Sequence, residues 1–157
     1  MERETPLISV IVPVYNVEAY VADCLRSLAA QTYPRIEIIV VDDASTDGSG
    51  RICDAWAAEE DRIRLVHFPE NRGLSAARNE GVRRAGGAFI TFVDSDDFAE
   101  PELLEKLYQS LRQSGADISI CRAEGLKVKN GPGGTYSREE AVNRMARRSC
   151  FLWTVWG

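Results

Sequence analysis

Cysteine and histidine are scarce in this chain of 157 residues, which has four cysteines and one histidine. The cysteines lie far apart, with no CxxC pair and no clustered histidine, so their spacing argues against a zinc site. We interpret them as the reduced thiols of a cytoplasmic protein, packed as small hydrophobic side chains. The single histidine, His67, has no serine or cysteine partner in an evident register, so we do not expect a catalytic triad.

Long apolar runs are also absent from the sequence. No stretch approaches the roughly 20 apolar residues of a membrane-spanning helix, and residues 1–6 lack the apolar core of a signal peptide. We therefore expect a cytoplasmic location. A basic face on the expected helix 139–148, made of Arg144, Arg147 and Arg148, leaves peripheral attachment to the inner face of a membrane as an alternative to a solvated surface.

Basic residues dominate no part of the sequence. The chain has 19 Lys+Arg against 24 Asp+Glu, a formal net charge of −5, with both signs interspersed. It lacks the basic stripe by which proteins neutralise phosphate backbones, so we do not expect nucleic acid as a partner. The length and the 45% hydrophobic content are typical of one globular domain.

Short apolar runs alternate with helical patterns over residues 7–121. The runs are rich in β-branched residues, as in strands buried on both faces, and the segments between them carry apolar stripes of helical period. This alternation predicts an α/β fold with an open, mostly parallel sheet flanked by helices on both faces. The expected strands are 7–14, 36–41, 63–67, 88–93 and 118–121, and the expected helices follow Asn16 and Pro101 and cover 49–59, 75–85 and 139–148.

Particular residues are expected at the ends of these elements. Pro13 cannot donate to a strand ladder and is expected to end the first strand, while Asn16 is expected to cap the helix after it. The glycine-rich segment 125–134 predicts a loop or hairpin. The apolar tail 151–157 predicts that the chain continues in a longer protein, with a terminal strand tucked into its own sheet as the alternative.

Polar residues collect where the expected strands end. In open parallel sheets, ligands bind beyond the carboxyl ends of the strands, and acidic residues from two strand ends repel one another there unless a cation intervenes. Carboxylate oxygens favour Mg²⁺, Mn²⁺ or Ca²⁺. The residues concerned are Tyr15, Asn16 and Glu18 after the first strand, Asp42, Asp43, Ser45, Thr46 and Asp47 after the second, Glu70, Asn71 and Arg72 after the third, and Asp94, Ser95, Asp96 and Asp97 after the fourth.

The triplet Asp94-Ser95-Asp96 is typical of a clamp for a metal and a diphosphate. Alternate side chains at a strand end point opposite ways, so one carboxylate can reach the metal while the other orients ribose or metal-bound water. Alone, such a triplet also fits a solvated turn. The sequence has no GxxxxGK[ST] motif and no GxGxxG motif after the first strand, so carboxylates and a metal would have to hold the phosphates of any bound nucleotide.

Five motifs follow one another along the chain. They are Val10–Asn16, Gln31–Tyr33, Ile39–Asp43 with Ser45–Asp47, Asn71–Ser75 with Ala77–Asn79, and Phe92–Asp97 followed by Pro101. In order and spacing they closely resemble the inverting family 2 glycosyltransferases of the GT-A fold, whose fold is Rossmann-like. The resemblance covers residues 5–121, or 117 of 157 positions, and implies a transferase that uses a nucleotide-sugar donor.

The resemblance also implies roles for particular residues. Pro13, Tyr15 and Asn16 match the segment that borders the nucleobase and ribose, and Asp43 matches a carboxylate that accepts a hydrogen bond from a base N–H, which suits uracil. Arg78 matches an arginine directed toward the phosphates or the base. The candidate nucleotide-binding residues are Pro13, Tyr15, Asn16, Glu18, Asp43, Arg78, Asp94 and Ser95, and the candidate metal ligands are Asp96 and Asp94.

The implied reaction is a single displacement at the anomeric carbon, with Mn²⁺ or Mg²⁺ on the departing nucleoside diphosphate. In the family, the catalytic base and the acceptor pocket lie in the second half, and the only carboxylates after Cys121 are Glu124, Glu139 and Glu140. We therefore assign no catalytic residue. We expect a donor-binding domain at 5–121, the start of an acceptor-side region at 122–157, a UDP-sugar donor, and a glycan, lipid-linked or protein acceptor.

Two other functions fit parts of the same pattern. One is a catalytically silent module that keeps the fold and the nucleotide pocket for binding or scaffolding. The other is a receiver-like phosphoacceptor domain, but the acids here follow the second and fourth strands and no lysine directly follows the fifth. The departures from the family pattern, Ala44 where glycine is common and Ala88 where glutamate is common, remove no ligand.

Overall fold

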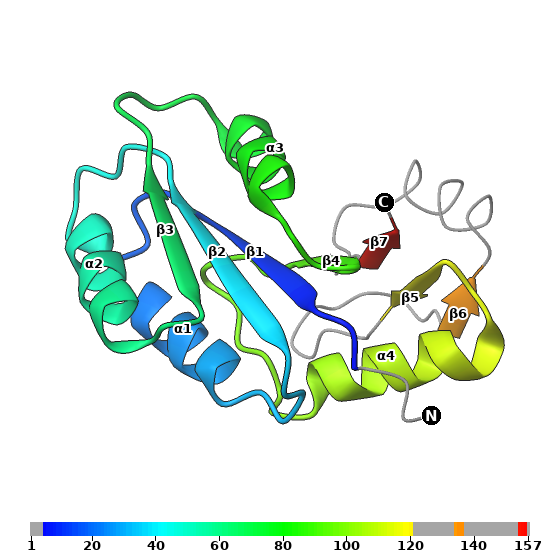
Figure 1. Ribbon diagram of the computed structural model, residues 1–157. Helices are drawn as coiled ribbons and strands as arrows, with labels where there is room; N and C mark the ends of the chain where they lie inside the picture. The colour runs from blue at the N-terminus through cyan, green and yellow to red at the C-terminus, as the bar shows by residue number, and fades with distance from the viewer. Residues whose placement is uncertain (1–4, 121–133, 137–153, 157) are drawn as a thin grey trace, which may run out of the picture.

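Five strands form the main sheet of the computed structural model, which describes residues 5–120, 134–136 and 154–156 (Figure 1). Their order across the sheet is β3-β2-β1-β4-β7. Strands β1 to β4 run parallel, and β7 is antiparallel to β4, which confirms the expected, mostly parallel sheet. The strands are β1 (Ile8–Val14), β2 (Ile36–Asp42), β3 (Ile63–His67), β4 (Phe89–Phe92) and β7 (Thr154–Trp156).

The strand order changes direction at β1. The chain moves outward from β1 through β2 to β3, and then returns to β4 on the other side of β1. In open α/β sheets, the crevice at such a switch point is where ligands bind. The residues that follow β1 and β4 therefore lie at the natural ligand position of this fold.

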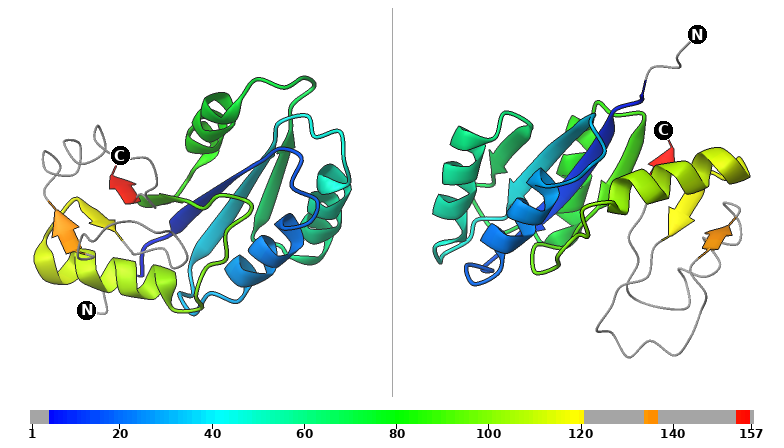
Figure 2. Two further views of the ribbon diagram at one scale, coloured as in Figure 1. Left: turned by 180° about the vertical axis from the view of Figure 1, so that it is seen from behind. Right: turned by 90° about the horizontal axis from the view of Figure 1, so that it is seen from below.

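Helices cover both faces of the sheet (Figures 1 and 2). Helices α1 (Val21–Ala29), α2 (Ser49–Glu59) and α4 (Leu103–Ser114) pack on one face, and α3 (Leu74–Arg84) packs on the other. Strands β1 and β2 are buried along their whole length, because alternate residues contact the helices of opposite faces. The expected α/β architecture is thus confirmed.

Helix α3 approaches the sheet closely because its inner face is built from small residues. Its buried residues are Ala77 and Gly81. A Cβ atom added to Gly81 would lie 2.3 Å from Cγ2 of Ile11, which is closer than carbon atoms can pack. This close approach brings Arg78 of the same helix toward β4, with its guanidinium carbon 5.9 Å from the centre of the Phe92 ring.

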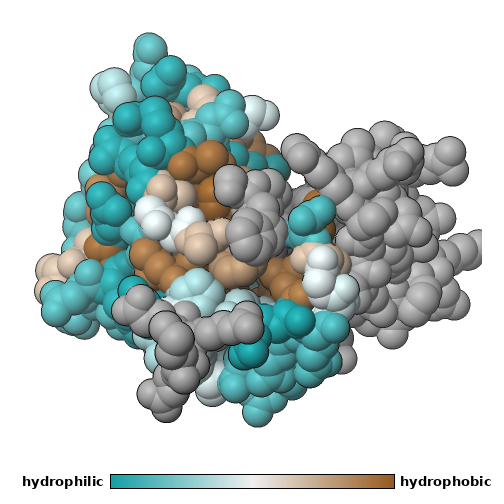
Figure 3. Space-filling model, turned by 45° about the vertical axis from the view of Figure 1, so that its right-hand side comes forward, coloured by the Kyte–Doolittle hydropathy of each residue, from teal (hydrophilic) through white to brown (hydrophobic). Residues whose placement is uncertain are grey.

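Helix α4 packs on β1 and β4 through a stripe of leucines. Leu104, Leu107 and Leu111 are buried, and Tyr108 meets the ring of Tyr33 edge-on at a centroid distance of 5.3 Å. Figure 3 shows hydrophobic residues gathered in the middle of one face of the molecule, with hydrophilic regions above and below them.

Two residues near the end of β1 behave differently from expectation. Asn16 does not cap α1, which begins at Val21. Its backbone is left-handed, with a φ of 50°, and its side-chain oxygen instead accepts the N–H of Thr46. Pro13 lies inside β1 rather than at its end. It follows the stretch of β1 that pairs with β4, whose ladder stops at Phe92, so its missing N–H interrupts no pairing with that strand.

The last expected parallel strand does not join the main sheet. Strand β5 (Ile118–Ile120) pairs antiparallel with β6 (Gly134–Tyr136) in a separate two-stranded sheet. The edge beside β4 is taken by β7, in agreement with the alternative interpretation of the apolar tail. The expected helix 139–148, with its basic face, lies outside the described residues.

Cys24 and Cys53 are free and buried. Burial raises the pKa of both thiols to about 12, so they stay protonated and pack as small hydrophobic groups, as expected. Among the helices of the described part of the chain, none is long and apolar enough to cross a bilayer.

Candidate functional site

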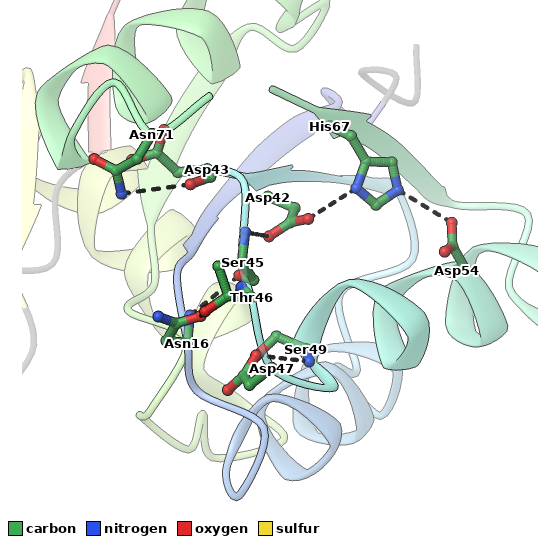
Figure 4. A network of polar contacts seen from close by, with 10 residues as sticks. All are labelled: Asn16, Asp42, Asp43, Ser45, Thr46, Asp47, Ser49, Asp54, His67 and Asn71. Atoms are coloured by element: carbon green, nitrogen blue, oxygen red, sulfur yellow. Dashed lines mark hydrogen bonds and ion pairs between the residues drawn. The ribbon is translucent and has the colours of Figure 1, made fainter. Parts of the chain in front are cut away.

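The loops that follow β1 and β2 are joined by hydrogen bonds at the carboxyl edge of the sheet (Figure 4). The backbone N–H of Asn16 donates to Oγ of Ser45 at 3.1 Å, and the N–H of Thr46 donates to Oδ1 of Asn16 at 2.8 Å. Asn16 and Ala44 both have left-handed backbones, with φ of 50° and 57°. Asparagine tolerates this conformation, whereas for alanine it costs roughly 1–2 kcal/mol. The contacts between the loops offset that strain.

Glu18 and Asp47 bind backbone amides at the start of α2. Oε2 of Glu18 accepts the N–H of Gly48 at 2.7 Å, and Oδ1 of Asp47 accepts the N–H of Ser49 at 2.9 Å. The hydrogen bonds from Ser49 hold the pKa of Asp47 below its ordinary value. In this structure Glu18, a candidate nucleotide-binding residue, thus stabilises a helix N-terminus, where negative charge is favoured.

Asp43 is buried, and both of its carboxylate oxygens are engaged by the loop between β3 and α3. Oδ1 accepts the N–H of Arg72 at 2.7 Å, and Oδ2 accepts the N–H of Gly73 at 2.8 Å. Its own N–H donates to the carbonyl of Val14 at the end of β1. Asp43 therefore ties together the segments that follow three strands of the sheet.

A second acidic network, built around His67, was assigned no function by the sequence analysis. Nδ1 of His67 lies 2.8 Å from Oδ2 of Asp42, and Nε2 lies 3.1 Å from Oδ1 of Asp54 on α2 (Figure 4). Burial alone would lower the pKa of His67, but the hydrogen bonds and charges of the two carboxylates outweigh burial and raise it. One feature of the sequence could have pointed to this network: Asp42 and His67 are each the last residue of a strand, and those two strands, β2 and β3, pair directly.

The loop after β4 carries the acidic triplet. Ser95 is buried, while Asp94 and Asp96 are exposed, and the N–H of Asp97 donates to the carbonyl of Asp94 in a turn at 2.9 Å. Partial burial raises the pKa of Asp97, and the charges of Asp94 and Asp96 raise it further. The expected crowding of carboxylates at this strand end is therefore present.

Arg78 reaches this loop from α3. Its Nη2 donates to Oδ1 of Asp94 at 2.7 Å, and the side chains of Arg78 and Asp94 are 37% and 50% exposed. The Nε of Arg78 is buried without a hydrogen-bond partner in the described structure. Such an unpaired donor is costly, so a small rearrangement that let Nε donate to an anion beside the acidic loop would be favourable.

The structure brings the candidate residues together in two groups. Asn16 and Glu18 contact the loop after β2, and Arg78 contacts Asp94. Tyr15 lies at the same carboxyl edge with its side chain exposed, which leaves the ring free to contact a ligand.

The donor set fits a hard divalent cation that takes few ligands from the protein. Asp94 and Asp96 present carboxylate oxygens after β4, and Asp96 makes no hydrogen bond or ion pair to the other described residues. No group of three His, Cys, Asp or Glu side chains in the described ranges is arranged to hold a metal by itself. Mg²⁺ and similar ions are commonly bound by one or two carboxylates plus the phosphates of a substrate, so two carboxylates are compatible with such a site.

Comparison with known proteins identifies the family. The model for "Glycosyl transferase family 2" matches residues 9–155. The chain is 46% identical to the glycosyltransferase GlyG of Streptococcus pneumoniae over 73% of this chain and 38% of GlyG. It is 37% identical to EpsJ of Bacillus subtilis, an uncharacterized glycosyltransferase, over 96% of this chain and 46% of EpsJ. The chain thus spans less than half the length of these relatives.

Solved structures agree with this result and show the same fold. TarS of S. aureus, in complex with UDP, is 33% identical with a TM-score of 0.70, over 80% of this chain and 38% of the TarS chain. The mannosyltransferase PcManGT of Pyrobaculum calidifontis, in complex with GDP-Man and Mn²⁺, is 31% identical with a TM-score of 0.70, over 76% of this chain and 36% of its own. Together with the order of the motifs around the acidic loop, these matches show that the chain belongs to glycosyl transferase family 2.

Proposed function

We propose that this chain binds the donor for a glycosyltransferase that moves a sugar from a nucleoside diphosphate to an acceptor with inversion. The observation that carries the proposal is the pairing of Arg78 with Asp94 at the end of β4, where Arg78 also keeps a buried, unpaired Nε. An arginine with spare donors beside two carboxylates suits a diphosphate together with a divalent cation. The binding of UDP by TarS and of GDP-Man with Mn²⁺ by PcManGT supports this choice of ligand.

Most of the candidate residues have a proposed task. Arg78 donates to the diphosphate, Pro13, Tyr15 and Asn16 border the base and ribose, and Ser95 supports the nucleotide from the acidic loop. Asp43 accepts the N–H of a uracil ring, since a carboxylate that already accepts two amides keeps further lone pairs. When bound to Asp96 and Asp94, Mn²⁺ or Mg²⁺ supplies a Lewis acid for the charge on the leaving diphosphate.

We infer that residues 5–121 are the donor-binding unit and that residues 122–157 begin the acceptor-side region. The four parallel strands and the helices that cover them all lie within the first range, which supports it as a unit, although β7 of the second range pairs with β4 at the edge of the same sheet. No residue of the chain is assigned as the catalytic base, so we expect weak transfer or none by the 157-residue chain. The acceptor belongs to the class of glycans, lipid-linked molecules or proteins, and similarity to TuaG of Bacillus subtilis, whose name assigns it to teichuronic acid biosynthesis, favours polysaccharide biosynthesis. The buried, free thiols support a cytoplasmic location.

Calorimetric titration tests the donor site. We expect UDP to bind more tightly than GDP or dTDP, and its affinity to rise when Mn²⁺ is added. In Asp96→Asn the gain from Mn²⁺ should disappear, because one metal ligand is lost. UDP binding that is equally strong with a chelator would contradict the proposal.

A catalytically silent module remains the second candidate, favoured by the lack of an assigned base. Donor binding does not separate the two functions. The two functions are separated by an assay of sugar transfer from UDP-sugars to glycan acceptors, made with a longer chain that includes the acceptor-side region. Robust turnover by the 157 residues alone would refute our argument about the base.

A further inference from the structure

Helix α1 and the turn that follows it place three buried side chains, Cys24, Ser27 and Gln31, along the loop that carries the acidic triplet. Ser27 and Gln31 are polar, yet only 3% and 7% exposed. Cys24 and Ser27 are three positions apart, and Gln31 follows four positions later, just beyond the end of the helix. Such spacing puts Cys24 and Ser27 on one side of α1, and Gln31 lies next to them, because its side chain reaches back to the carbonyl of Ser27.

The first two side chains bind the main chain on either side of the acidic segment. The thiol of Cys24 lies 3.6 Å from the carbonyl oxygen of Asp94, at the start of the loop. Oγ of Ser27 accepts the N–H of Ala99 at 3.1 Å and donates to the carbonyl of Cys24 at 2.7 Å. Residues 95–98, which include Asp96, therefore span the interval between two anchors.

Gln31 holds the continuation of the loop and the start of α4. Its Nε2 donates to the carbonyl of Glu100 at 2.7 Å, and its Oε1 accepts the N–H of Leu104 at 3.1 Å. Nε2 also donates to the carbonyl of Ser27 at 3.2 Å. The order of the three anchors in the sequence matches the order of their partners along the loop.

An apolar residue would fill each of these buried positions without the cost of removing a polar group from water. What the polar side chains add is a defined main-chain position, because each hydrogen bond fixes one carbonyl or amide of the loop. Each of the three side chains contacts the main chain of the segment from Asp94 to the start of α4, which includes Asp96.

We propose that Cys24, Ser27 and Gln31 are positioning residues, which hold residues 94–100 so that the carboxylates of Asp94 and Asp96 face the same cation and diphosphate. This inference rests on the donor site proposed above. It extends the set of residues on which that site depends to a helix that contributes no ligand.

The chain offers a matched pair of variants for the test. Ser9 is also fully buried, and its Oγ also makes two hydrogen bonds, donating to Glu37 and accepting the N–H of Gly87, but at the opposite end of the sheet. Ser27→Ala and Ser9→Ala should therefore lower the urea midpoint of unfolding by similar amounts. UDP affinity is measured by calorimetry for both, with Mn²⁺ and with a chelator.

We expect Ser27→Ala to reduce the Mn²⁺-dependent part of UDP affinity by roughly five- to tenfold, since small displacements of liganding groups are costly. Its affinity in chelator should stay that of the wild type, and Ser9→Ala should match the wild type in both conditions. Gln31→Glu, which keeps the shape but loses both donated hydrogen bonds, should repeat the effect of Ser27→Ala. If Ser27→Ala does not fold, Cys24→Ala replaces it, because it removes only the weak thiol contact.

Equal Mn²⁺ dependence in Ser27→Ala, Gln31→Glu and Ser9→Ala would overturn the positioning role while leaving the donor site intact. If the UDP affinity of the wild type does not change when Mn²⁺ is added, the proposed donor site is overturned, and the positioning role with it.

Discussion

Arg78 and Asp94 form an ion pair, with Nη2 of the arginine 2.7 Å from Oδ1 of the aspartate. The pair connects α3, on one face of the sheet, with the loop at the end of β4. Both side chains are substantially exposed, and exposed pairs of this kind contribute little to stability. The guanidinium is thus held beside the acidic loop by an interaction that a phosphate group can replace at small cost.

We predict that Arg78→Lys lowers UDP affinity by about 1.5 to 3 kcal/mol, or roughly 10- to 150-fold, because lysine keeps the charge but loses the planar set of donors. Calorimetry in the presence of Mn²⁺ measures this loss. Arg83→Lys is the control, since Arg83 lies on the same helix and, among the described residues, pairs with Glu80 alone at an exposed position. Similar affinities for the two variants would remove Arg78 from the proposed site.

Asp43→Asn is expected to destabilise the fold. The two carboxylate oxygens accept the amides of Arg72 and Gly73, and asparagine would turn an NH₂ group toward one of them. The loss should be about 1–3 kcal/mol in the free energy of unfolding, because a buried donor is left unpaired. Urea unfolding gives the value. Asp54→Asn, at an exposed carboxylate, should change stability by less than about 0.5 kcal/mol, and a loss as large as that of Asp43→Asn would contradict this account.

The pH dependence of stability should report the His67 network. The pKa of His67 is raised above its ordinary value of 6.5, because the contacts with Asp42 and Asp54 outweigh the opposing effect of burial. Its charge therefore stabilises the fold fully below the unfolded pKa, and this contribution is lost as pH rises through the higher folded pKa.

We predict that the urea midpoint of the wild type falls, relative to that of His67→Gln, as pH rises from about 6 to about 9. The difference between the two chains removes the contribution of other titrating groups. A difference that stays constant, or that grows with pH, would show that His67 does not carry the charge that its two partners favour.

Gly87→Ala should destabilise the chain much more than Gly86→Ala. A Cβ at Gly87 would lie 2.6 Å from Oγ of Ser9 and 2.8 Å from the carbonyl oxygen of Leu7, whereas at Gly86 its nearest neighbour is a carboxylate oxygen of Glu37 at 3.5 Å. We expect a loss of about 1–3 kcal/mol for the first variant and less than about 0.5 kcal/mol for the second. Thermal or urea unfolding of both measures the contrast. Equal stabilities would mean that the β1–β4 junction adjusts more freely than the structure indicates.

Much of the fold was predictable because its signals are local. Helix α2 and strand β3 occupy the expected ranges, Ser49–Glu59 and Ile63–His67, since each has its own period of apolar residues. The pairing partner of the strand at residues 118–120 was not predictable in this way. A strand pattern does not specify its partner, and here β6 pairs with β5 while β7 takes the edge of β4.

The polar contacts of the candidate site show the same division. Asn16 is of a residue type that commonly caps helices, but here its side chain accepts a hydrogen bond from the N–H of Thr46. Asp42 and Asp43 are neighbours in sequence, yet one faces His67 and the other faces the amides of Arg72 and Gly73. Successive side chains of a strand point to opposite sides, so adjacent carboxylates meet different surroundings.

The sequence by itself therefore determined the order of strands and helices, the edge at which the acidic residues collect, and the family to which its motifs belong, because these follow from periodicity and spacing. Only the tertiary structure decided which partners each carboxylate has, that Arg78 meets Asp94, and that α1 anchors the acidic loop. The reason is physical: the hydrogen bonds from Arg78 to Asp94 and from Leu104 to Gln31 join residues that are 16 and 73 positions apart, and only the packing of helices on the sheet brings such residues together.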